Sequence, residues 1–299
     1  MHNQTANLGV FGGTAPFQLP PTKSEELHIS TPFGDPSGPI IELELSPGTY
    51  VYFMNRHGLG HVLSPSSINY RANIWAMKHV GVTHLLSLSA CGSLSENMPP
   101  SKTLFVPDQL FDWTKGIRKH TFFEGNNDAV AHIGLGDPIC LELAREVHTL
   151  CKEIVEINPD QFQLFSETFV GTTVVIEGPR FSTHAESVFF KNVMGADAVA
   201  MTPLPEASLA REAGLCYSVL HFPADYDSWR KAMKGVNADE VKAGLEPFKP
   251  VPSILIPKLA RAIKTGRCDC AKSMEGFTIH SNLEAVPLKK MEKYALFLK

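Results

Sequence analysis

The chain has no long hydrophobic run and no block of basic residues. None of its apolar stretches approaches the ~18 residues that a membrane-spanning helix needs, so we expect no membrane partner. Its 31 acidic and 27 basic side chains give a net charge of −4, which provides no general attraction to nucleic acid. Met1–Gly13 lacks the basic and apolar regions of a signal peptide. We therefore expect a cytoplasmic protein.

Cysteine is also scarce, with six residues. A chain of 299 residues can bury a core without disulfides, so a secreted disulfide framework is not expected. Cys268 and Cys270 are too close together for a usual structural zinc pair, and the sequence shows no second pair. We interpret them as solvent-side thiols and expect no metal. The other four lie in apolar context and are interpreted as buried: Cys91, Cys140, Cys151 and Cys216.

No linker, low-complexity stretch or internal repeat divides the chain, so residues 1–299 are predicted to form a single domain. Apolar runs typical of strands alternate with segments of helical periodicity, which predicts an α/β fold with a central mixed β-sheet flanked by helices. Strands are predicted at Asn7–Phe11, Ile40–Leu45, Thr49–Met54, Val82–Leu88, Phe169–Ile176, Ala198–Met201 and Leu215–Phe222. Helices are predicted at Asn69–Val80, Asp137–Ile154, after Thr183, at Pro205–Ala213, Asn237–Leu245 and Pro252–Lys264.

Sites in such folds form on loops at the carboxyl ends of strands, and two early strand ends carry residues suited to anions. Gly12-Gly13-Thr14 brings backbone amides and a hydroxyl together, although a plain turn explains it equally well. Arg56 and His57 follow a predicted strand, and arginine is suited to phosphate. The glycines between His57 and His61 argue against a helix, so a metal pair there is not expected.

Three later segments add polar groups at strand ends. Ser87–Ser93 offers small hydroxyl residues but lacks the GxSxG elbow of a hydrolase serine. Glu177–Glu186 combines a Gly-Pro turn, an exposed aromatic residue and a capping box. Asp225 and Asp227 are either plain turn residues or readers of a heterocycle's ring nitrogens and amino group. Residues two apart in an extended segment face the same side, so we expect both aspartates to point into one pocket.

Taken in order, these segments resemble the methylthioadenosine phosphorylase branch of the trimeric purine nucleoside phosphorylase family. The resemblance covers roughly residues 8–279 and leaves the segment after Cys270 poorly matched. It implies that inorganic phosphate, as co-substrate and without a cofactor, attacks C1′ of a purine nucleoside and releases the base. The matching segments are Arg56-His57-Gly58, Ile68–Lys78, Ala90–Leu94, Ile176–Ser182, Met201-Thr202, Pro205-Glu206, Leu209–Ala213 and Asp225–Asp227.

The resemblance also implies roles for individual residues. Asp225 and Asp227 would be catalytic, one donating a proton to purine N7 and the other accepting from the 6-amino group. Burial must raise the pKa of the donor. Phosphate would be held by Thr14, Arg56, His57, Ser89, the backbone of Ala90 and Thr202. The nucleoside would be held by Phe181, Ser182, Met201, Asp225, Asp227, Val241 and, from a neighbouring subunit of a homotrimer with shared sites, His132.

Ser182 and Asp225 favour a 6-aminopurine, because a carboxylate accepts from an amino group. The expected reaction converts 5′-methylthioadenosine and phosphate to adenine and 5-methylthioribose 1-phosphate. A 6-oxopurine phosphorylase, acting on inosine or guanosine, is the first alternative. A catalytically weak nucleoside-binding protein is the second, supported by the family departures at Ala15, Ala200 and Ala224. Lys242 is unexpected in a methylthio pocket and leaves the 5′ substituent open.

Overall fold

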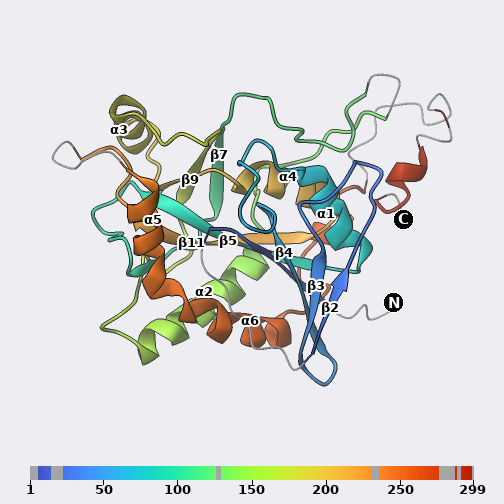
Figure 1. The fold of residues 1–299 in the computed structure, drawn as a ribbon, viewed down its shortest axis with the longest axis horizontal. Coiled ribbons are helices and arrows are strands. Elements are labelled where there is room, and N and C mark those ends of the chain that lie inside the picture. Colours follow the sequence, from blue (N-terminus) through green and yellow to red (C-terminus); the bar gives the residue numbers. More distant parts are fainter. Residues whose placement is uncertain are drawn as a thin grey trace.

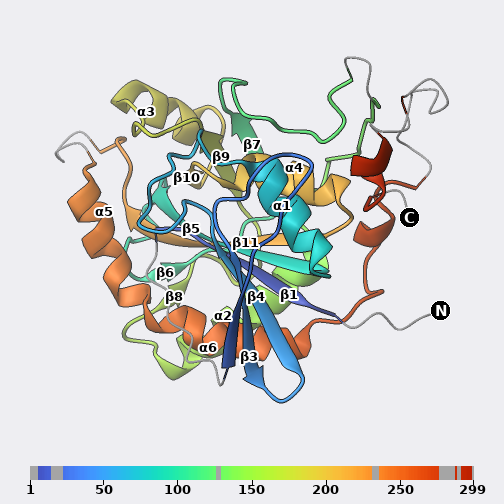
Figure 2. The same cartoon turned by 45° about the vertical axis from the view of Figure 1, so that its right-hand side comes forward.

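The computed structural model describes residues 6–14, 23–125, 129–230, 236–275, 287 and 291–297. A mixed β-sheet lies between layers of helices, as predicted (Figures 1 and 2). The strand order is β2-β3-β4-β1-β5-β10-β9-β7, and β11 also pairs with β5. The strands are β1 (Leu8–Gly12), β2 (Lys23–Leu27), β3 (Ile40–Ser46), β4 (Thr49–Asn55), β5 (His84–Ser93), β7 (Gln109–Trp113), β9 (Thr172–Ile176), β10 (Ala198–Ala200) and β11 (Cys216–Asp225), with β6 (Thr103–Leu104) and β8 (Gln163–Leu164) in a separate pair.

Strand β5 organises the sheet because it pairs with three other strands. It runs parallel to β1 and to β11, and β1 in turn runs parallel to β4. The carboxyl ends of these four strands therefore meet at one edge of the sheet. Strand β10 pairs antiparallel with the end of β5 at Gly92 and Ser93, which brings the residues after β10 to the same edge.

The helices cover both faces of the sheet (Figures 1 and 2). Helix α1 packs beside α4, α2 packs beside α6 on the other face, and α5 packs against β11. Helix α2 buries Leu143, Val147, Leu150 and Ile154, whose spacing forms one apolar stripe. The helices are α1 (Tyr70–His79), α2 (Leu141–Ile157), α3 (His184–Asn192), α4 (Pro203–Glu212), α5 (Ala238–Leu245) and α6 (Pro250–Ala262), with 3₁₀ turns η1 (Glu246–Phe248), η2 (Cys270–Lys272) and η4 (Glu292–Tyr294).

Several boundaries differ from the sequence prediction, and three of them have a clear structural cause. Helix α2 was predicted from Asp137 but begins at Leu141, because the carbonyl of Asp137 is engaged by Arg211 outside the helix. Strand β5 continues to Ser93, beyond its predicted end at Leu88, because Gly92 and Ser93 pair with β10. Strand β11 likewise extends to Asp225 through its pairing with β5.

Strand β2 was missed because its residues are exposed along most of their length and leave no buried face in the sequence. Strand β7 was also missed, since its side chains are only partly covered. Within the described residues, no helix combines the length and the apolarity needed to cross a membrane. Ala15 lies outside the described residues.

Candidate active site

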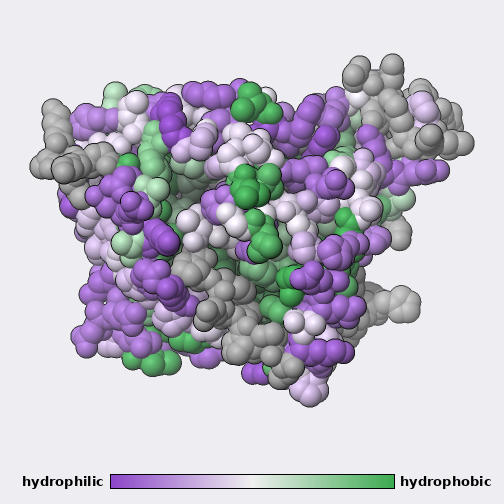
Figure 3. Space-filling model, in the orientation of Figure 1, coloured by the Kyte–Doolittle hydropathy of each residue, from purple (hydrophilic) through white to green (hydrophobic). Residues whose placement is uncertain are grey.

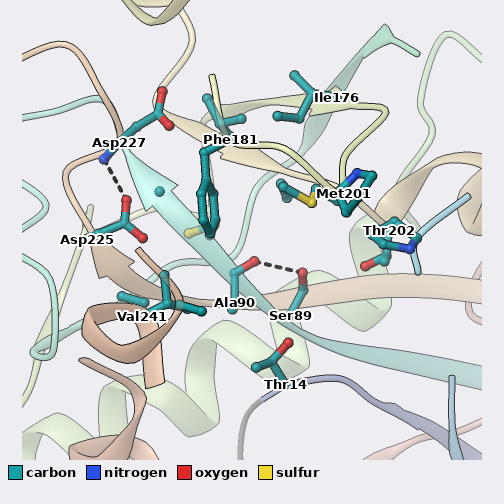
Figure 4. Close-up of a pocket in the computed structure, with 18 of the residues that line it drawn as sticks. Thr14, Ser89, Ala90, Ile176, Phe181, Met201, Thr202, Asp225, Asp227 and Val241 are labelled. Carbon is teal, nitrogen blue, oxygen red and sulfur yellow. Dashed lines mark hydrogen bonds between the residues drawn. The ribbon is translucent and has the colours of Figure 1, made fainter. Parts of the chain in front are cut away.

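A pocket of about 260 Å³ opens where the carboxyl ends of β1, β4, β5 and β11 meet the residues after β10 (Figure 4). The structure brings together eleven of the thirteen residues that the sequence singled out. Those that line the pocket are Thr14, Arg56, His57, Ser89, Ala90, Phe181, Met201, Thr202, Asp225, Asp227 and Val241.

Arg56 forms the buried floor of one end of the pocket, with 1% of its surface exposed. Its Nε lies 2.8 Å from Oε1 of Glu206, which is equally buried. Nη2 donates to the carbonyl of Phe11 and to Oγ of Ser87, and Nη1 donates to the carbonyl of Leu88. Because an Nη group carries two hydrogens, one Nη1 hydrogen stays available for a ligand. The bidentate fork that arginine often presents to phosphate is therefore already used by the protein.

The bare backbone of Gly13 makes room for this arginine. A Cβ at Gly13 would lie 2.7 Å from Nη1 of Arg56 and 2.9 Å from the carbonyl oxygen of Leu88. Such separations are too short for any side chain, so the glycine at position 13 permits close packing around the guanidinium. Thr14 follows directly and lines the pocket.

His57 stands next to Arg56 as a neutral imidazole. Burial, and then the charge of Arg56, lower its pKa to about 4. Its Nδ1 lies 2.8 Å from the carbonyl oxygen of Leu63, so Nδ1 carries the hydrogen and Nε2 is left as an acceptor. The ring stacks on His61, with ring centroids 4.1 Å apart, and His61 also lines the pocket.

Ser89 and Ala90 come from the middle of β5, and Thr202 lies across the pocket from Asp225 and Asp227 (Figure 4). The hydroxyl of Ser89 donates to the carbonyl of Ala90 at 3.1 Å. Thr202 is 4% exposed and occupies the N-cap position of α4, where its side chain makes no capping hydrogen bond. Three hydroxyl groups, from Thr14, Ser89 and Thr202, thus accompany Arg56 and His57 at one end of the pocket. The guanidinium of Arg56 and these hydroxyl groups can donate hydrogen bonds to a phosphate-sized anion.

The two aspartates occupy the other end (Figure 4). Oδ1 of Asp225 accepts a hydrogen bond from the backbone N–H of Asp227 at 2.6 Å. Burial raises the pKa of Asp225 to about 7, and the charges of Asp227 and Glu240 add to this, while the N–H of Asp227 opposes it. Burial also raises the pKa of Asp227. Near neutral pH, Asp225 is therefore divided between its protonated and ionised forms.

Both aspartates reach the pocket, but not through the extended backbone that the sequence suggested. Asp227 has φ +46°, in the left-handed region, so the chain turns sharply there. Gly92 of β5 gives the turn its space, because a Cβ there would lie 3.0 Å from Cβ of Asp227 and 3.1 Å from Oδ1 of Asp225.

Phe181, Met201 and Val241 supply apolar surface between the two ends (Figure 4). Ala238 and Val241 form the wall that α5 contributes. Lys242 is exposed and does not line the pocket, so this wall is apolar. The lysine that was unexpected in a methylthio pocket therefore lies outside it. Ala200 and Ala224 line the pocket as small side chains.

Two predicted residues do not line the pocket of this chain. Ser182 is 7% exposed, and its carbonyl accepts a hydrogen bond from Oγ of Ser228 at 2.8 Å. This hydrogen bond ties the loop that contains Ser182 to the residue after Asp227. His132 is exposed and lies outside the pocket of its own chain.

Buried groups that support the site were assigned no role in the prediction from sequence. Glu206 pairs with Arg56 and accepts a hydrogen bond from the hydroxyl of Tyr217 at 2.9 Å. Arg118 donates to the carbonyl of Leu204 at 2.8 Å and also to that of Met201, and it pairs with Glu177 at 2.8 Å. Glu206 had two signals, because it is a lone carboxylate within the apolar stretch 203–210 and it lies in a segment that resembles the family. Arg118 gave none, because its partners come from distant segments.

The whole chain is similar to proteins of one family. The model of the phosphorylase superfamily matches residues 7–246. The S-methyl-5′-thioadenosine phosphorylase of Hyperthermus butylicus is 40% identical over 90% of this chain and 94% of its own length. A methylthioadenosine phosphorylase from an antarctic soil metagenomic library superposes with a TM-score of 0.83 at 34% identity, over 99% of this chain and 100% of that chain.

A structure of methylthioadenosine phosphorylase from Schistosoma mansoni in complex with adenine superposes with a TM-score of 0.77 at 32% identity. The match covers 90% of this chain and 95% of that chain. The chain thus shares its fold and nearly its whole length with these proteins. It belongs to the phosphorylase superfamily and, within it, to the S-methyl-5′-thioadenosine phosphorylase family.

Proposed function

We propose that this protein cleaves 5′-methylthioadenosine with inorganic phosphate and releases adenine and 5-methylthioribose 1-phosphate. The observation that carries the proposal is a single pocket with two unlike ends. One end gathers a buried arginine and three hydroxyl groups, and the other holds Asp225, whose pKa is raised to about 7. The names of the relatives support the choice of nucleoside.

Phosphate binds at the end formed by Thr14, Arg56, His57, Ser89 and Thr202, with the backbone of Ala90. Arg56 provides one N–H and a charge that Glu206 partly balances. Nε2 of His57 accepts a hydrogen bond from a protonated phosphate oxygen. Phosphate then faces C1′ of the nucleoside, and this positioning replaces a protein nucleophile.

Adenine binds between Phe181 and the two aspartates, with the ribose against Met201. Protonated Asp225 donates its proton to N7 as the C1′–N9 bond breaks, and the bonding electrons move into the purine ring. The C1′–O bond to phosphate forms on the opposite side of the sugar. Asp227 accepts a hydrogen bond from the 6-amino group. Neutral adenine leaves, and Asp225 regains its proton from solvent.

The 5′-methylthio group lies against Val241 and Ala238 of α5. His132 of a neighbouring subunit completes this part of the pocket in a homotrimer with shared sites. Its exposure outside its own pocket supports this arrangement. In the loop after β4, Leu59 and Val62 are 89% and 76% exposed. The space-filling view also shows exposed hydrophobic residues near the centre of the face that it presents (Figure 3).

Residues 1–299 act as one domain, inorganic phosphate is a co-substrate, and the reaction needs no cofactor. The net charge of −4 favours neither nucleic acid nor an anionic membrane as a partner. All six cysteines are free thiols, which is typical of a reducing compartment and supports the cytoplasm as the location.

The test is to incubate the purified protein with methylthioadenosine, adenosine or inosine, with and without phosphate, and to identify the base released. We expect adenine from methylthioadenosine, only when phosphate is present. Preferential release of hypoxanthine would identify a 6-oxopurine phosphorylase. Binding of methylthioadenosine without turnover would identify a nucleoside-binding protein.

A further inference from the structure

Four cysteines that are far apart in the sequence meet at one place in the fold. The Sγ atoms of Cys140, Cys216, Cys268 and Cys270 all lie within 4.8 Å of one another. The sulfur of Cys268 is 3.7 Å from that of Cys140 and 3.3 Å from that of Cys216, and all four are free thiols. Cys140 and Cys216 thus supply the second pair that the sequence did not reveal. Cys270 is 5% exposed, so its interpretation as a solvent-side thiol was wrong.

The spacing and the donor set match a known kind of metal centre. Zinc bound by four thiolates is tetrahedral, with Zn–S bonds of ~2.3 Å, and this geometry places neighbouring sulfur atoms ~3.8 Å apart. Four sulfur ligands without oxygen or nitrogen favour zinc over magnesium, calcium or manganese. We propose that Cys140, Cys216, Cys268 and Cys270 bind one zinc ion in a tetrahedral structural site.

Rigid elements hold two of the ligands before the metal arrives. Cys140 is the N-cap residue of α2, and Cys216 begins β11. The backbone N–H of Cys140 donates to the carbonyl of Tyr217 at 2.8 Å, which ties these two elements together next to the sulfur atoms. The N-terminal end of a helix also favours a thiolate, because the helix dipole is positive there.

The local charges offset those of a thiolate centre. Zinc displaces one proton from each thiol, so the four protons go to solvent and the zinc with its four thiolates carries a net charge of −2. Nη1 of Arg211 lies 3.9 Å from Sγ of Cys270. Half-buried Lys78 also lies within electrostatic reach of Cys216. These two cations suit an anionic metal centre.

The site serves architecture and not the reaction. Cys216 and Asp225 are the two ends of β11, so ~30 Å of strand separates the metal from the two aspartates, and none of the four cysteines lines the pocket. Cys268 and Cys270 belong to the segment that follows α6, and η2 packs on the turn between α4 and β11. Zinc would fasten this segment to α2 and β11, the work that disulfides perform in secreted proteins.

Metal analysis of the full chain tests the proposal. Protein purified under reducing conditions without added metal or chelator should contain about one zinc ion per chain. After removal of the zinc, Co²⁺ should bind and give the visible bands of tetrahedral sulfur coordination. Absence of zinc together with failure to bind Zn²⁺ or Co²⁺ overturns the proposal. The mass of protein purified under these reducing conditions gives a second test. A mass two hydrogens below that of the fully reduced chain for each disulfide bond also overturns the proposal and identifies disulfides instead.

Two variants separate ligands from ordinary buried thiols. Cys268→Ser removes the most exposed ligand and should lose zinc, and a chelator should no longer change its Tm. Cys151→Ala changes a buried cysteine outside the cluster, so this variant should keep its zinc. The wild type and Cys151→Ala should both lose at least roughly 5 °C in Tm when a chelator is added. Equal zinc content in the two variants contradicts the assignment. If Cys268→Ser does not fold, the metal content and Co²⁺ spectrum of the wild type decide the question.

Discussion

Asp225 accepts a hydrogen bond from the backbone N–H of Asp227 and also lies close to the carboxylate of Asp227. The two interactions act in opposite directions, because the amide stabilises the ionised form of Asp225 and the neighbouring charge destabilises it. Burial decides the balance and raises the pKa of Asp225 to about 7. A residue that would otherwise be a surface carboxylate is thereby able to act as an acid near neutral pH.

Asp225→Asn keeps the shape of this side chain but removes its ionisable proton. We expect kcat/KM for methylthioadenosine to fall by ~10²–10⁴, the usual effect of losing a positioned general acid. The variant should also accept inosine better relative to methylthioadenosine, because an amide can donate to a 6-oxo group. Steady-state kinetics with both nucleosides measure this. Wild-type activity with an unchanged preference would remove the proposed role of Asp225.

The raised pKa of Asp225 also predicts the pH dependence of the wild type. The proton donor is present below about pH 7 and is lost above it, so kcat/KM should decline on the alkaline side. Asp225→Asn should lack this limb, while any limb caused by titration of phosphate appears in both proteins. His57, with its pKa lowered to about 4, should add no inflection between pH 5 and 7. Profiles of both proteins between pH 5 and 9 test the prediction.

The same shift predicts how stability changes with pH. The folded protein holds the proton of Asp225 up to about pH 7, whereas an unfolded chain releases it near pH ~3.9. Stability due to this group therefore falls as pH rises between these values. The Tm of Asp225→Asn, relative to the wild type, should rise over the same interval. A difference that stays constant with pH would indicate that Asp225 titrates normally in the folded protein.

Arg56→Ala should impair both phosphate binding and stability. Phosphate loses a charge and an N–H, so the phosphate KM should rise, and Glu206 is left as a buried unpaired charge, which typically costs ~3–5 kcal/mol. The double variant Arg56→Ala/Glu206→Gln should recover part of the stability but not the phosphate affinity. Denaturant unfolding and phosphate saturation curves separate the two effects. Unchanged phosphate saturation in both variants would exclude Arg56 from the anion site.

His132→Ala tests the shared site. We expect a raised KM for methylthioadenosine, with little change in the phosphate KM, in a protein that still sediments as a trimer. His28→Ala is a matched control, because His28 is also exposed and follows the edge strand β2. An active monomer, or equal effects of the two substitutions, would contradict the proposed arrangement.

Much of the framework was predictable because burial leaves periodic patterns. The strands that carry Arg56 and Asp225 were recognised from their apolar runs, and the cap of α3 from Thr183 and Glu186. Contacts between distant segments leave no such pattern. The hydrogen-bond and ion-pair partners of Arg56 come from β1, β5 and α4. The residues next to Arg56 in the sequence therefore could not show that most of its N–H groups are already used. The meeting of Cys140 with Cys268, 128 positions later, was hidden for the same reason.

The interactions that hold Arg56 have a consequence for the thermodynamics of anion binding. A free arginine side chain loses roughly 2 kcal/mol of conformational entropy when it is immobilised. Phe11, Ser87, Leu88 and Glu206 immobilise this one during folding, before any anion arrives. Phosphate therefore binds to an arginine whose rotamer is already fixed. Its association should show the modest entropy change of a rigid receptor, without the signature of a long side chain becoming ordered.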